Sequence, residues 1–241
     1  MSSSPTHKPD FKRGPDEADI SSRLNWLRAG VLGANDGIVS IAALLVGVGA
    51  ATTEHSVIFT AAMAGIAAGA LSMGVGEFVS VSSQRDAEEA QLARERVWHK
   101  ARPAWELEQL VRLNMETGMS EATARAASIE QTAKDPLAIH ARMHLSVDPD
   151  ELTKPVHAGV ASLIAFTLGG IAPLLTTLLP PAHMRIPLTF LAVLVALAAT
   201  GYASASVAHS PYLKAIVRNV SGGAAAMAIT YGIGLLVGTA L

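Results

Sequence analysis

The chain has 241 residues, of which 50% are hydrophobic and only 16% charged. This composition is too apolar for an ordinary soluble domain and favours a membrane protein. The absence of cysteine excludes disulfides, iron–sulfur clusters and thiolate metal ligands. The net charge of -2 indicates no partner, so the positions of the charges carry the information.

Residues 1–28 are polar, contain Pro and Ser, and have no apolar stretch of the signal-peptide kind. We expect them to form a cytosolic tail, and the first apolar span to direct the chain to the membrane.

Five apolar runs follow, each long enough to cross the roughly 30 Å hydrocarbon core of a bilayer. They cover approximately residues 31–50, 56–79, 156–179, 186–208 and 215–240. No alternating strand pattern is visible. We therefore expect an all-α membrane protein with five transmembrane helices and a helical cytosolic insert between the second and third. The expected divisions are 1–28, 29–80, 81–154 and 155–241.

The basic residues predict the orientation of the chain. Of the 18 Lys and Arg residues, 17 lie in the tail, in the 81–154 segment or in the 209–218 loop, and Arg185 alone lies between the third and fourth runs. Cytosolic loops carry the excess of Lys and Arg. We expect a multi-pass protein of the cell inner (plasma) membrane, with the N-terminus and the insert cytosolic and the C-terminus outside.

The insert, 81–154, differs in kind from the spans, because it holds thirteen acidic and ten basic residues. Its apolar residues recur at helical spacing, Pro103 and Gly118 interrupt the pattern, and Ser120 is placed to cap a helix. This pattern predicts three or four helices.

Small residues crowd the second span. Ala61, Gly65, Gly69, Met73 and Glu77 recur every four residues, so they share one stripe that should face another helix. Tight packing accounts for the glycines, but it leaves Met73 and Glu77 unexplained.

Two carboxylates lie within the spans, Asp36 and Glu77, both toward the predicted cytosolic side. Intramembrane acids usually face a wet interior and mark an ion or proton path. Met73, one turn from Glu77, adds a soft sulfur ligand that would favour divalent iron or manganese over magnesium and calcium. The alternative is that both acids are hydrated at the interface and that Asp36 caps a helix beginning after Gly33.

The insert offers further metal ligands. His140 and His144 are four residues apart, a spacing that places both on one face of a helix. A solvated charged face is the alternative, supported by the interleaved Arg94, Arg96 and Arg112. The acidic candidates on its first two helices are Asp86, Glu88, Glu89, Glu95, Glu106, Glu108 and Glu116.

The stretches GANDGIVS and GALSMGVGEFVSVSSQRDAEEAQ, the acidic insert and LIAFTLGGIAPLL together resemble the vacuolar iron transporter family, as a bacterial-type member. The resemblance covers nearly the whole chain after residue 25. It implies a five-span homodimer with a metal path at the two-fold axis and proton-coupled export of divalent iron, often manganese too. By motif position, Asp36 and Met73 look like the membrane metal ligands of the family, and Glu77 matches its motif glutamate.

The insert departs from the pattern of this family. Glu95 and Glu106 fit it, whereas Trp98 and Gln109 occupy positions where further glutamates are expected. His140 and His144 stand near the end, where the family has Met and Glu ligands.

We therefore expect a proton antiporter that exports divalent iron and/or manganese from the cytosol. The alternative is a membrane-anchored metal sensor or buffer that transports nothing. An enzyme is not expected, because the sequence has neither a Glu-x-x-His pair nor a G-x-S-x-G elbow. The expected metal ligands are Asp36, Met73, Glu77, Glu88, Glu95, Glu106, Glu108, His140 and His144.

The expected partners are divalent metal ions, protons, membrane lipids and a second copy of the chain, with no nucleic acid. No permanently bound cofactor is expected. Fe²⁺ and/or Mn²⁺ would be cargo, and Zn²⁺ or Co²⁺ would also suit the cytosolic domain.

Overall fold

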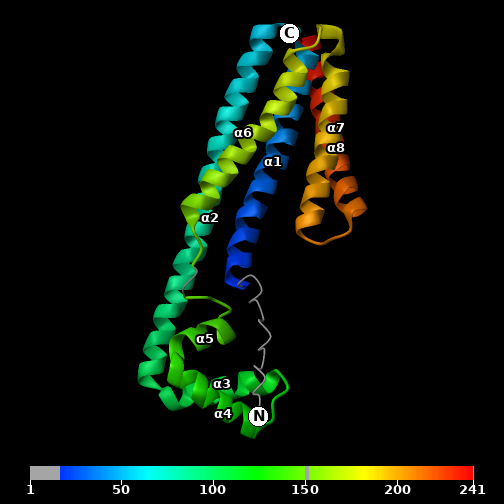
Figure 1. Ribbon diagram of the computed structural model, residues 1–241. Coiled ribbons are helices and arrows are strands. Elements are labelled where there is room, and N and C mark those ends of the chain that lie inside the picture. The colour runs from blue at the N-terminus through cyan, green and yellow to red at the C-terminus, as the bar shows by residue number, and fades with distance from the viewer. Residues whose placement is uncertain (1–16, 150–151, 241) are drawn as a thin grey trace, which may run out of the picture. The chain divides into compact units, whose positions relative to one another are not determined.

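The structure is a computed structural model that describes residues 17–149 and 152–240, with side chains described from Arg28 onward. Within these ranges it is entirely helical, which confirms the all-α prediction (Figure 1). The helices are α1 (Glu17–Ala51), α2 (His55–Ala101), α3 (Pro103–Glu116), α4 (Glu121–Lys134), α5 (Pro136–His144), α6 (Pro155–Leu178), α7 (Ala182–Val207) and α8 (Tyr212–Ala240).

Five helices in the described part are long and apolar enough to cross a membrane: α1 from Arg28, α2, α6, α7 and α8. They coincide with the five apolar runs of the sequence. α2 has 47 residues, hence a length of about 70 Å at 1.5 Å per residue, more than twice the hydrocarbon thickness. One uninterrupted helix therefore supplies both the second span and the first helix of the insert.

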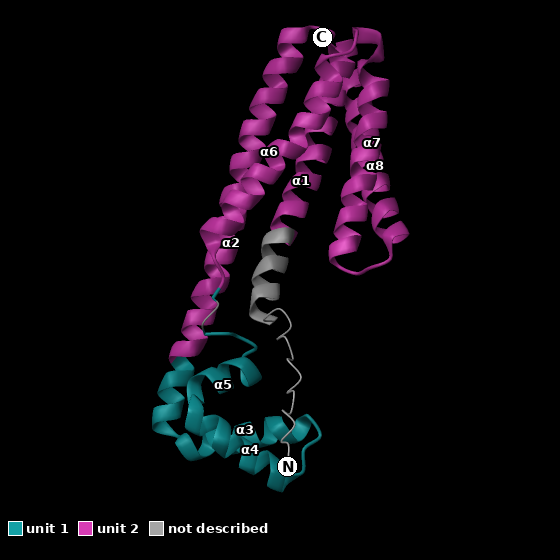
Figure 2. Ribbon diagram, in the orientation of Figure 1, with its two compact units in different colours: residues 1–25, 94–152 teal, residues 26–93, 153–241 magenta. Residues whose placement is uncertain are grey.

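The chain divides into two compact units (Figure 2). The membrane unit comprises residues 26–93 and 153–241, and the insert unit comprises 94–152 together with 1–25. Most of the predicted tail, 1–28, lies outside the residues with described side chains. The stretch 81–93 belongs to the membrane unit, and the insert boundary at 81 stays a prediction.

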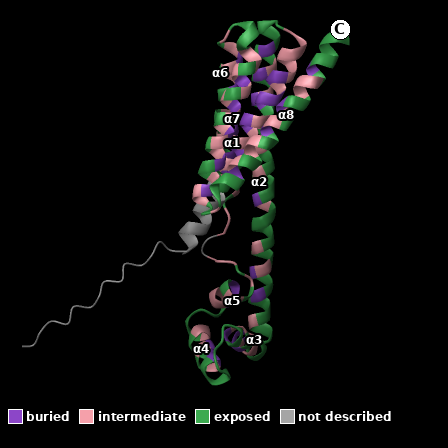
Figure 3. Ribbon diagram, turned by 90° about the vertical axis from the view of Figure 1, so that its right-hand side faces the viewer, coloured by how far each residue is buried: buried purple, intermediate pink, exposed green. Residues whose placement is uncertain are grey.

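Buried residues lie along α1 (purple in Figure 3), and they belong to two separate core clusters. Ile41 and Leu45 pack with α2 and with Phe166 of α6. Ile38 and Ala42 pack with α7 and α8. Every other span thus contacts α1, and α1 is the helix that carries Asp36.

Glycines of α1 allow its backbone to approach that of α6. A Cβ atom at Gly37 would collide with the backbone of Phe166, and one at Gly33 would lie 2.7 Å from the carbonyl oxygen of Ser162. On the other side of the contact, a Cβ atom at Gly169 would collide with the backbone of Ala34. The glycines around Asp36 therefore fix α6 against α1 at the level of this carboxylate, as close packing of small residues does in membranes.

The turn between α1 and α2 is fastened to α7 by Arg185. Its guanidinium donates to the carbonyl oxygen of Thr53 at 3.1 Å and to Nδ1 of His55 at 2.9 Å. Because a guanidinium only donates, Nδ1 of His55 must carry no proton in this contact. Arg185, in the first turn of α7, thus holds the turn of the α1–α2 hairpin.

Three short helices, α3, α4 and α5, complete the insert, in agreement with the three or four expected. Pro103 begins α3 and Gly118, with φ +99, follows its end. The predicted cap at Ser120 is confirmed, because its side chain accepts from the backbone N–H of Thr123. Asp135 closes α4 and caps α5 by accepting from Ala138 at 3.0 Å.

Side-chain contacts then lock α3 to α4. Asn114 of α3 donates to Ser128 at 2.9 Å and to Gln131 at 3.0 Å, both on α4. Arg125 of α4 forms a two-point ion pair with Glu108 of α3. These contacts hold α3 and α4 in fixed positions relative to each other.

Candidate metal centres

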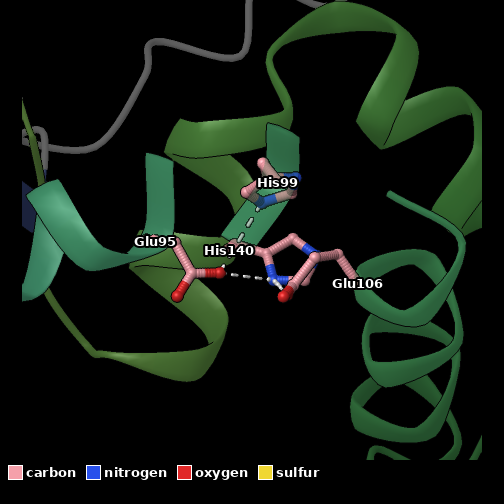
Figure 4. Close-up of side chains that lie close together, drawn as sticks. All are labelled: Glu95, His99, Glu106 and His140. Carbon is pink, nitrogen blue, oxygen red and sulfur yellow. Dashed lines mark ion pairs between the residues drawn. The ribbon is translucent and has the colours of Figure 1, made fainter. Parts of the chain in front are cut away.

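Four metal-binding side chains converge inside the insert unit: Glu95 and His99 from α2, Glu106 from α3 and His140 from α5 (Figure 4). Each offers a ligand atom, and these atoms all lie within 4.8 Å of one another. Nδ1 of His140 is 3.1 Å from Oε1 of Glu95 and 3.5 Å from Oε2 of Glu106. Nε2 of His99 is 3.6 Å from Oε1 of Glu95. We call these four residues the insert cluster.

Local sequence explains the convergence. Glu95 and His99 are one turn apart on α2 and share a face. The chain breaks at Arg102 and restarts with Pro103, which places Glu106 in the first turn of α3. The cap at Asp135 orients α5, the helix that carries His140.

The insert cluster is buried but poorly hydrogen-bonded. Glu95, Glu106 and His140 are 0–1% exposed. In the described part of the chain, both oxygens of each glutamate, both ring nitrogens of His140 and Nε2 of His99 lack a hydrogen-bond partner. Native proteins rarely leave so many buried polar atoms unsatisfied, and an ion is one of the standard reasons. Each of the four residues could offer one of these unpaired atoms to a coordinated cation.

Burial dominates the protonation of this cluster. Desolvation, together with the nearby charge of Glu95, raises the pKa of Glu106 to about 7, against a smaller opposing effect of Arg102. Desolvation, with the neighbouring His99 and His144, lowers the pKa of His140 to about 4. Desolvation also lowers the pKa of His99 despite the nearby Glu95. Neutral imidazoles are therefore available as ligands at neutral pH.

This donor set fits a divalent transition metal. Two imidazole nitrogens suit Fe, Co, Ni, Cu and Zn, whereas the carboxylates also suit Mn. Two ionised glutamates would balance the charge of one divalent ion, which otherwise could not be buried without a large desolvation cost. Calcium and magnesium, which take oxygen ligands, fit this set less well.

His144 and Gln109 lie at the edge of the insert cluster. Nδ1 of His144 is 4.0 Å from Oε2 of Glu95, and its Nε2 lies 2.8 Å from the amide nitrogen of Gln109. The amide nitrogen donates, so Nε2 accepts and the proton of the ring stands on Nδ1, toward Glu95. In this arrangement Nδ1 of His144 faces the cluster at 4.0 Å from Glu95, beyond hydrogen-bond distance.

The structure does not bring Glu88 and Glu108 into the cluster. Glu88 belongs to the membrane unit, where it accepts from the backbone and hydroxyl of Thr153 at 3.3 and 3.4 Å. Glu108 is paired with Arg125, which lowers the pKa of its carboxyl group. These contacts supply a structural use for both glutamates, and their role as metal ligands stays a prediction.

Sequence reasoning missed His99 and Gln109 as contributors. His99 stands four residues after Glu95 on the same helix, and this spacing would have revealed it. Its ring packs edge-on against that of His140, with centroids 4.4 Å apart. Gln109 gave no such signal, because only the fold shows that it meets His144.

In the membrane unit, Asp36 lies in the middle of a continuous α1. The alternative in which it caps a helix beginning after Gly33 is therefore wrong. Its half-buried carboxylate accepts from the hydroxyl of Ser40, one turn further on, at 3.1 Å.

Asp36 and Met73 lie at similar depth in the α1–α2 hairpin. Phe166 of α6 lies against both Gly37 and Gly69, because a Cβ atom at either glycine would meet it. Asp36 neighbours Gly37, and Met73 lies one turn from Gly69. Both residues therefore lie within about one helical turn of a glycine that Phe166 packs against.

Glu77 lies one further turn along α2, and its carboxylate faces Arg28 of α1 at 3.9 Å. The side chain of Glu77 is 14% exposed and that of Arg28 is 67% exposed. An enclosed acid and an exposed base therefore face each other on the two helices of the hairpin.

Four rows of residues run along α2, each with a step of four residues. From the core row, the apolar, small and metal rows are turned by about 100°, 200° and 300° around the helix. The first is the core row: Ile58, Ala62, Ile66, Ala70 and Gly74, all buried. The metal row is the stripe singled out in the sequence, Ala61, Gly65, Gly69, Met73 and Glu77, and it is half-buried. Opposite the core lies the exposed small row: Thr60, Ala64, Ala68, Ser72 and Gly76. The apolar row, Phe59, Met63, Ala67, Leu71 and Val75, is exposed as well.

The metal row does face other helices, as expected. A Cβ atom at Gly65 would lie 2.5 Å from the side chain of Leu44 on α1, and one at Gly69 would collide with the ring of Phe166. Met73 packs against the same core. On the helix, this row lies between the core row and the small row.

Comparison with known proteins adds a separate line of support. The sequence model of the VIT family matches residues 27–235. The chain belongs to the VIT family. It is a multi-pass membrane protein of a family of transporters and not an enzyme, as the sequence predicted.

Named relatives agree over most of the chain. A protein of Acanthamoeba castellanii named "Vacuolar iron transporter" is 40% identical over 212 residues, which is 88% of this chain and 78% of that protein. "Vacuolar iron transporter homolog 4" of Arabidopsis thaliana is 36% identical over 222 residues, covering 92% and 88%. "Vacuolar iron transporter homolog 3" of the same plant is 35% identical over 241 residues, covering 99% and 97%.

We predict that the insert cluster binds one transition-metal ion. With Co²⁺ as a spectroscopic probe of the purified full chain, wild type should show a saturable site. Glu95→Gln should weaken the affinity at least about tenfold, because a charged ligand is lost. Glu130→Gln, which changes an exposed glutamate on α4, is the matched control and should bind as wild type does. Equal affinity in the two variants would contradict this assignment.

The affinity of the cluster should fall as the pH falls below about 7. Metal binding requires Glu106 to lose its proton, whereas His140, with a pKa of about 4, is already neutral. Between pH 7.5 and 5.5 the proton on Glu106 alone should weaken binding by roughly 25-fold. Equilibrium titration with Co²⁺ at both pH values measures this, and Glu106→Gln should remove most of the dependence. A wild-type affinity that does not change with pH would exclude the mechanism.

Proposed function

We propose that the chain exports divalent iron and/or manganese from the cytosol in exchange for protons. The insert would collect the ion, and the α1–α2 hairpins of two subunits would carry it across the membrane. Membership of the VIT family and relatives named as iron transporters support this proposal. The proposed location is the inner (plasma) membrane. In the proposed orientation, the N-terminus and the insert are cytosolic.

The single observation on which the proposal rests is the alignment of Asp36 and Met73 within the spans. A carboxylate within a transmembrane helix is costly unless it faces a wet cavity or a cation. A thioether at similar depth makes a mixed ligand set that suits Fe²⁺ and Mn²⁺ better than Mg²⁺ or Ca²⁺.

Proton coupling follows from ligand chemistry. A carboxylate binds metal only after losing its proton, so each ion that binds displaces protons and each proton that returns favours release. Two Asp36 carboxylates brought close in a dimer would repel each other, and a divalent cation between them would relieve this repulsion. An inward proton gradient could thereby drive the metal outward.

The homodimer is part of this proposal. The small row of α2 is exposed along the membrane unit, and small residues in lipid allow close approach of a second helix. Met73 and Glu77, in the adjacent metal row, would then stand at the edge of the α2–α2 contact. Two copies would supply two sets of Asp36 and Met73 to one ion.

A membrane-anchored metal sensor or buffer is the second candidate. The buried insert cluster favours it, because a buffer needs only such a site. Metal flux distinguishes the two, since a buffer moves no ion.

Reconstituted wild type should take up Fe²⁺ or Mn²⁺ into proteoliposomes under an imposed pH gradient, with protons moving the other way. Asp36→Asn should lower the initial rate at least about tenfold, because the amide cannot neutralise the cation. A metal-sensitive dye and a pH dye enclosed in the vesicles measure both fluxes.

The control is Glu54→Gln, which changes an exposed carboxylate in the α1–α2 turn of the same hairpin. It should transport at the wild-type rate. Absence of flux in wild type would favour the sensor or buffer, and a wild-type rate in Asp36→Asn would exclude the proposed path.

Cross-linking tests the dimer, and the absence of cysteine from the chain makes single-cysteine variants unambiguous. Ala68→Cys, in the small row, should form a disulfide-linked dimer in the membrane on mild oxidation. Leu71→Cys, in the apolar row and at similar depth, should not. Equal cross-linking at the two positions would contradict an α2–α2 contact through the small row.

A further inference from the structure

Arg28 is the only Lys or Arg from residue 28 to residue 84, a stretch that covers most of the α1–α2 hairpin of the membrane unit. The same stretch carries three carboxylates, and of these Glu54 lies in the turn at the opposite end. The guanidinium of Arg28 stands 3.9 Å from the carboxylate of Glu77. Among the described residues, it is the one cation within ion-pair distance of this acid.

We propose that Arg28 is a specificity residue: a resident counter-ion that occupies Glu77 until a divalent cation displaces it. This inference rests on the proposed transport function. It assigns to Arg28 the rejection of monovalent cations at the entrance of the path.

The two partners differ in their freedom to move. Glu77 is largely enclosed, with 14% of its side chain exposed, whereas 67% of the Arg28 side chain is exposed. When the pair opens, the guanidinium therefore moves into water easily, because it is already largely hydrated. The carboxylate stays in place. Glu77 is the fixed part of the site and Arg28 the movable part.

Charge decides which ions can open the pair. The Coulomb energy at a given distance scales with the product of the charges, so a divalent ion gains twice what a monovalent ion gains at Glu77. A monovalent ion at a similar distance from Glu77 gains no more Coulomb energy than the tethered guanidinium that it must replace. Such competition discriminates against the wrong ligand without any contact that favours the right one.

The strength of the pair suits this role. An ion pair with one exposed partner contributes little, typically less than a buried one. A divalent ion can therefore displace Arg28 without binding Glu77 so tightly that it stays there. A transport path requires this, because it must also release its ion. Glu77 lies one turn from Met73, so an ion that has displaced Arg28 is next to the ligands deeper in the hairpin.

Mn²⁺ uptake into proteoliposomes tests the proposal, in K⁺ medium and in medium where choline replaces K⁺ at equal ionic strength. In choline, Arg28→Gln should lower the half-saturating Mn²⁺ concentration by roughly fivefold, because no guanidinium competes. In K⁺ medium this gain should be largely lost, since K⁺ now reaches Glu77. For wild type and for Arg28→Lys, the half-saturating Mn²⁺ concentration should be the same in K⁺ medium as in choline medium.

Arg85→Gln is the matched control, because Arg85 is an exposed arginine of α2 that pairs with Glu89 at 2.9 Å. It should behave as wild type. Arg28→Met serves as a second neutral variant if Arg28→Gln does not fold, because it keeps a long apolar stem.

A neutral variant with the half-saturation and K⁺ response of wild type would overturn the proposal. So would a lowered maximal rate at unchanged half-saturation, which indicates a structural role only. If wild type itself moves no Mn²⁺, the transport function fails first, and the role of Arg28 fails with it.

Discussion

A carboxylate removed from water needs a cation, and this requirement organises both units of the protein. In the insert, Glu95 and Glu106 are almost completely buried and face Nδ1 of His140 at 3.1 and 3.5 Å. In the membrane unit, Glu77 faces Arg28 and Asp36 accepts from Ser40. In the insert, burial raises the pKa of Glu106 to about 7, against a smaller opposing effect of Arg102. Each of these acids costs stability unless a charge, a proton or a metal compensates it.

The rest of the fold serves to hold these acids in place. α1 is central because its two buried faces pack against every other span, and its glycines let the α6 backbone approach at the level of Asp36. α2 contributes to both units and carries Met73, Glu77, Glu95 and His99 on one helix. Caps at Ser120 and Asp135 then orient the short helices that bring His140 to the cluster.

Much of the architecture could be predicted from the sequence. The five spans follow from the length of the apolar runs, because only a helix of about 20 residues satisfies its backbone inside lipid. The helices of the insert follow from periodicity, and Ser120 from capping chemistry. The family follows from the stretches around Asp36 and Met73. These features are local or compositional, so they survive without any knowledge of tertiary contacts.

The candidate sites were predicted only in part. Glu95, Glu106 and His140 do converge, but they do so with His99 and with Gln109 at the edge. Glu108 is also a glutamate and lies two residues from Glu106, but it is paired with Arg125 instead. A side chain two positions further along a helix points about 200° away, so the direction in which a helix packs decides which acid joins the cluster.

The sequence by itself determined which segments enter the membrane, which segment stays in water and which residue types are available as ligands. It did so because hydrophobic length and helical period are properties of short segments. Only the tertiary structure decided that Arg28 stands opposite Glu77, that Asp36 lies inside a continuous helix, and that four potential metal-binding side chains from three helices meet. Those outcomes depend on how helices far apart in the chain pack together, and small steric differences, such as a missing Cβ atom at Gly37, set that packing.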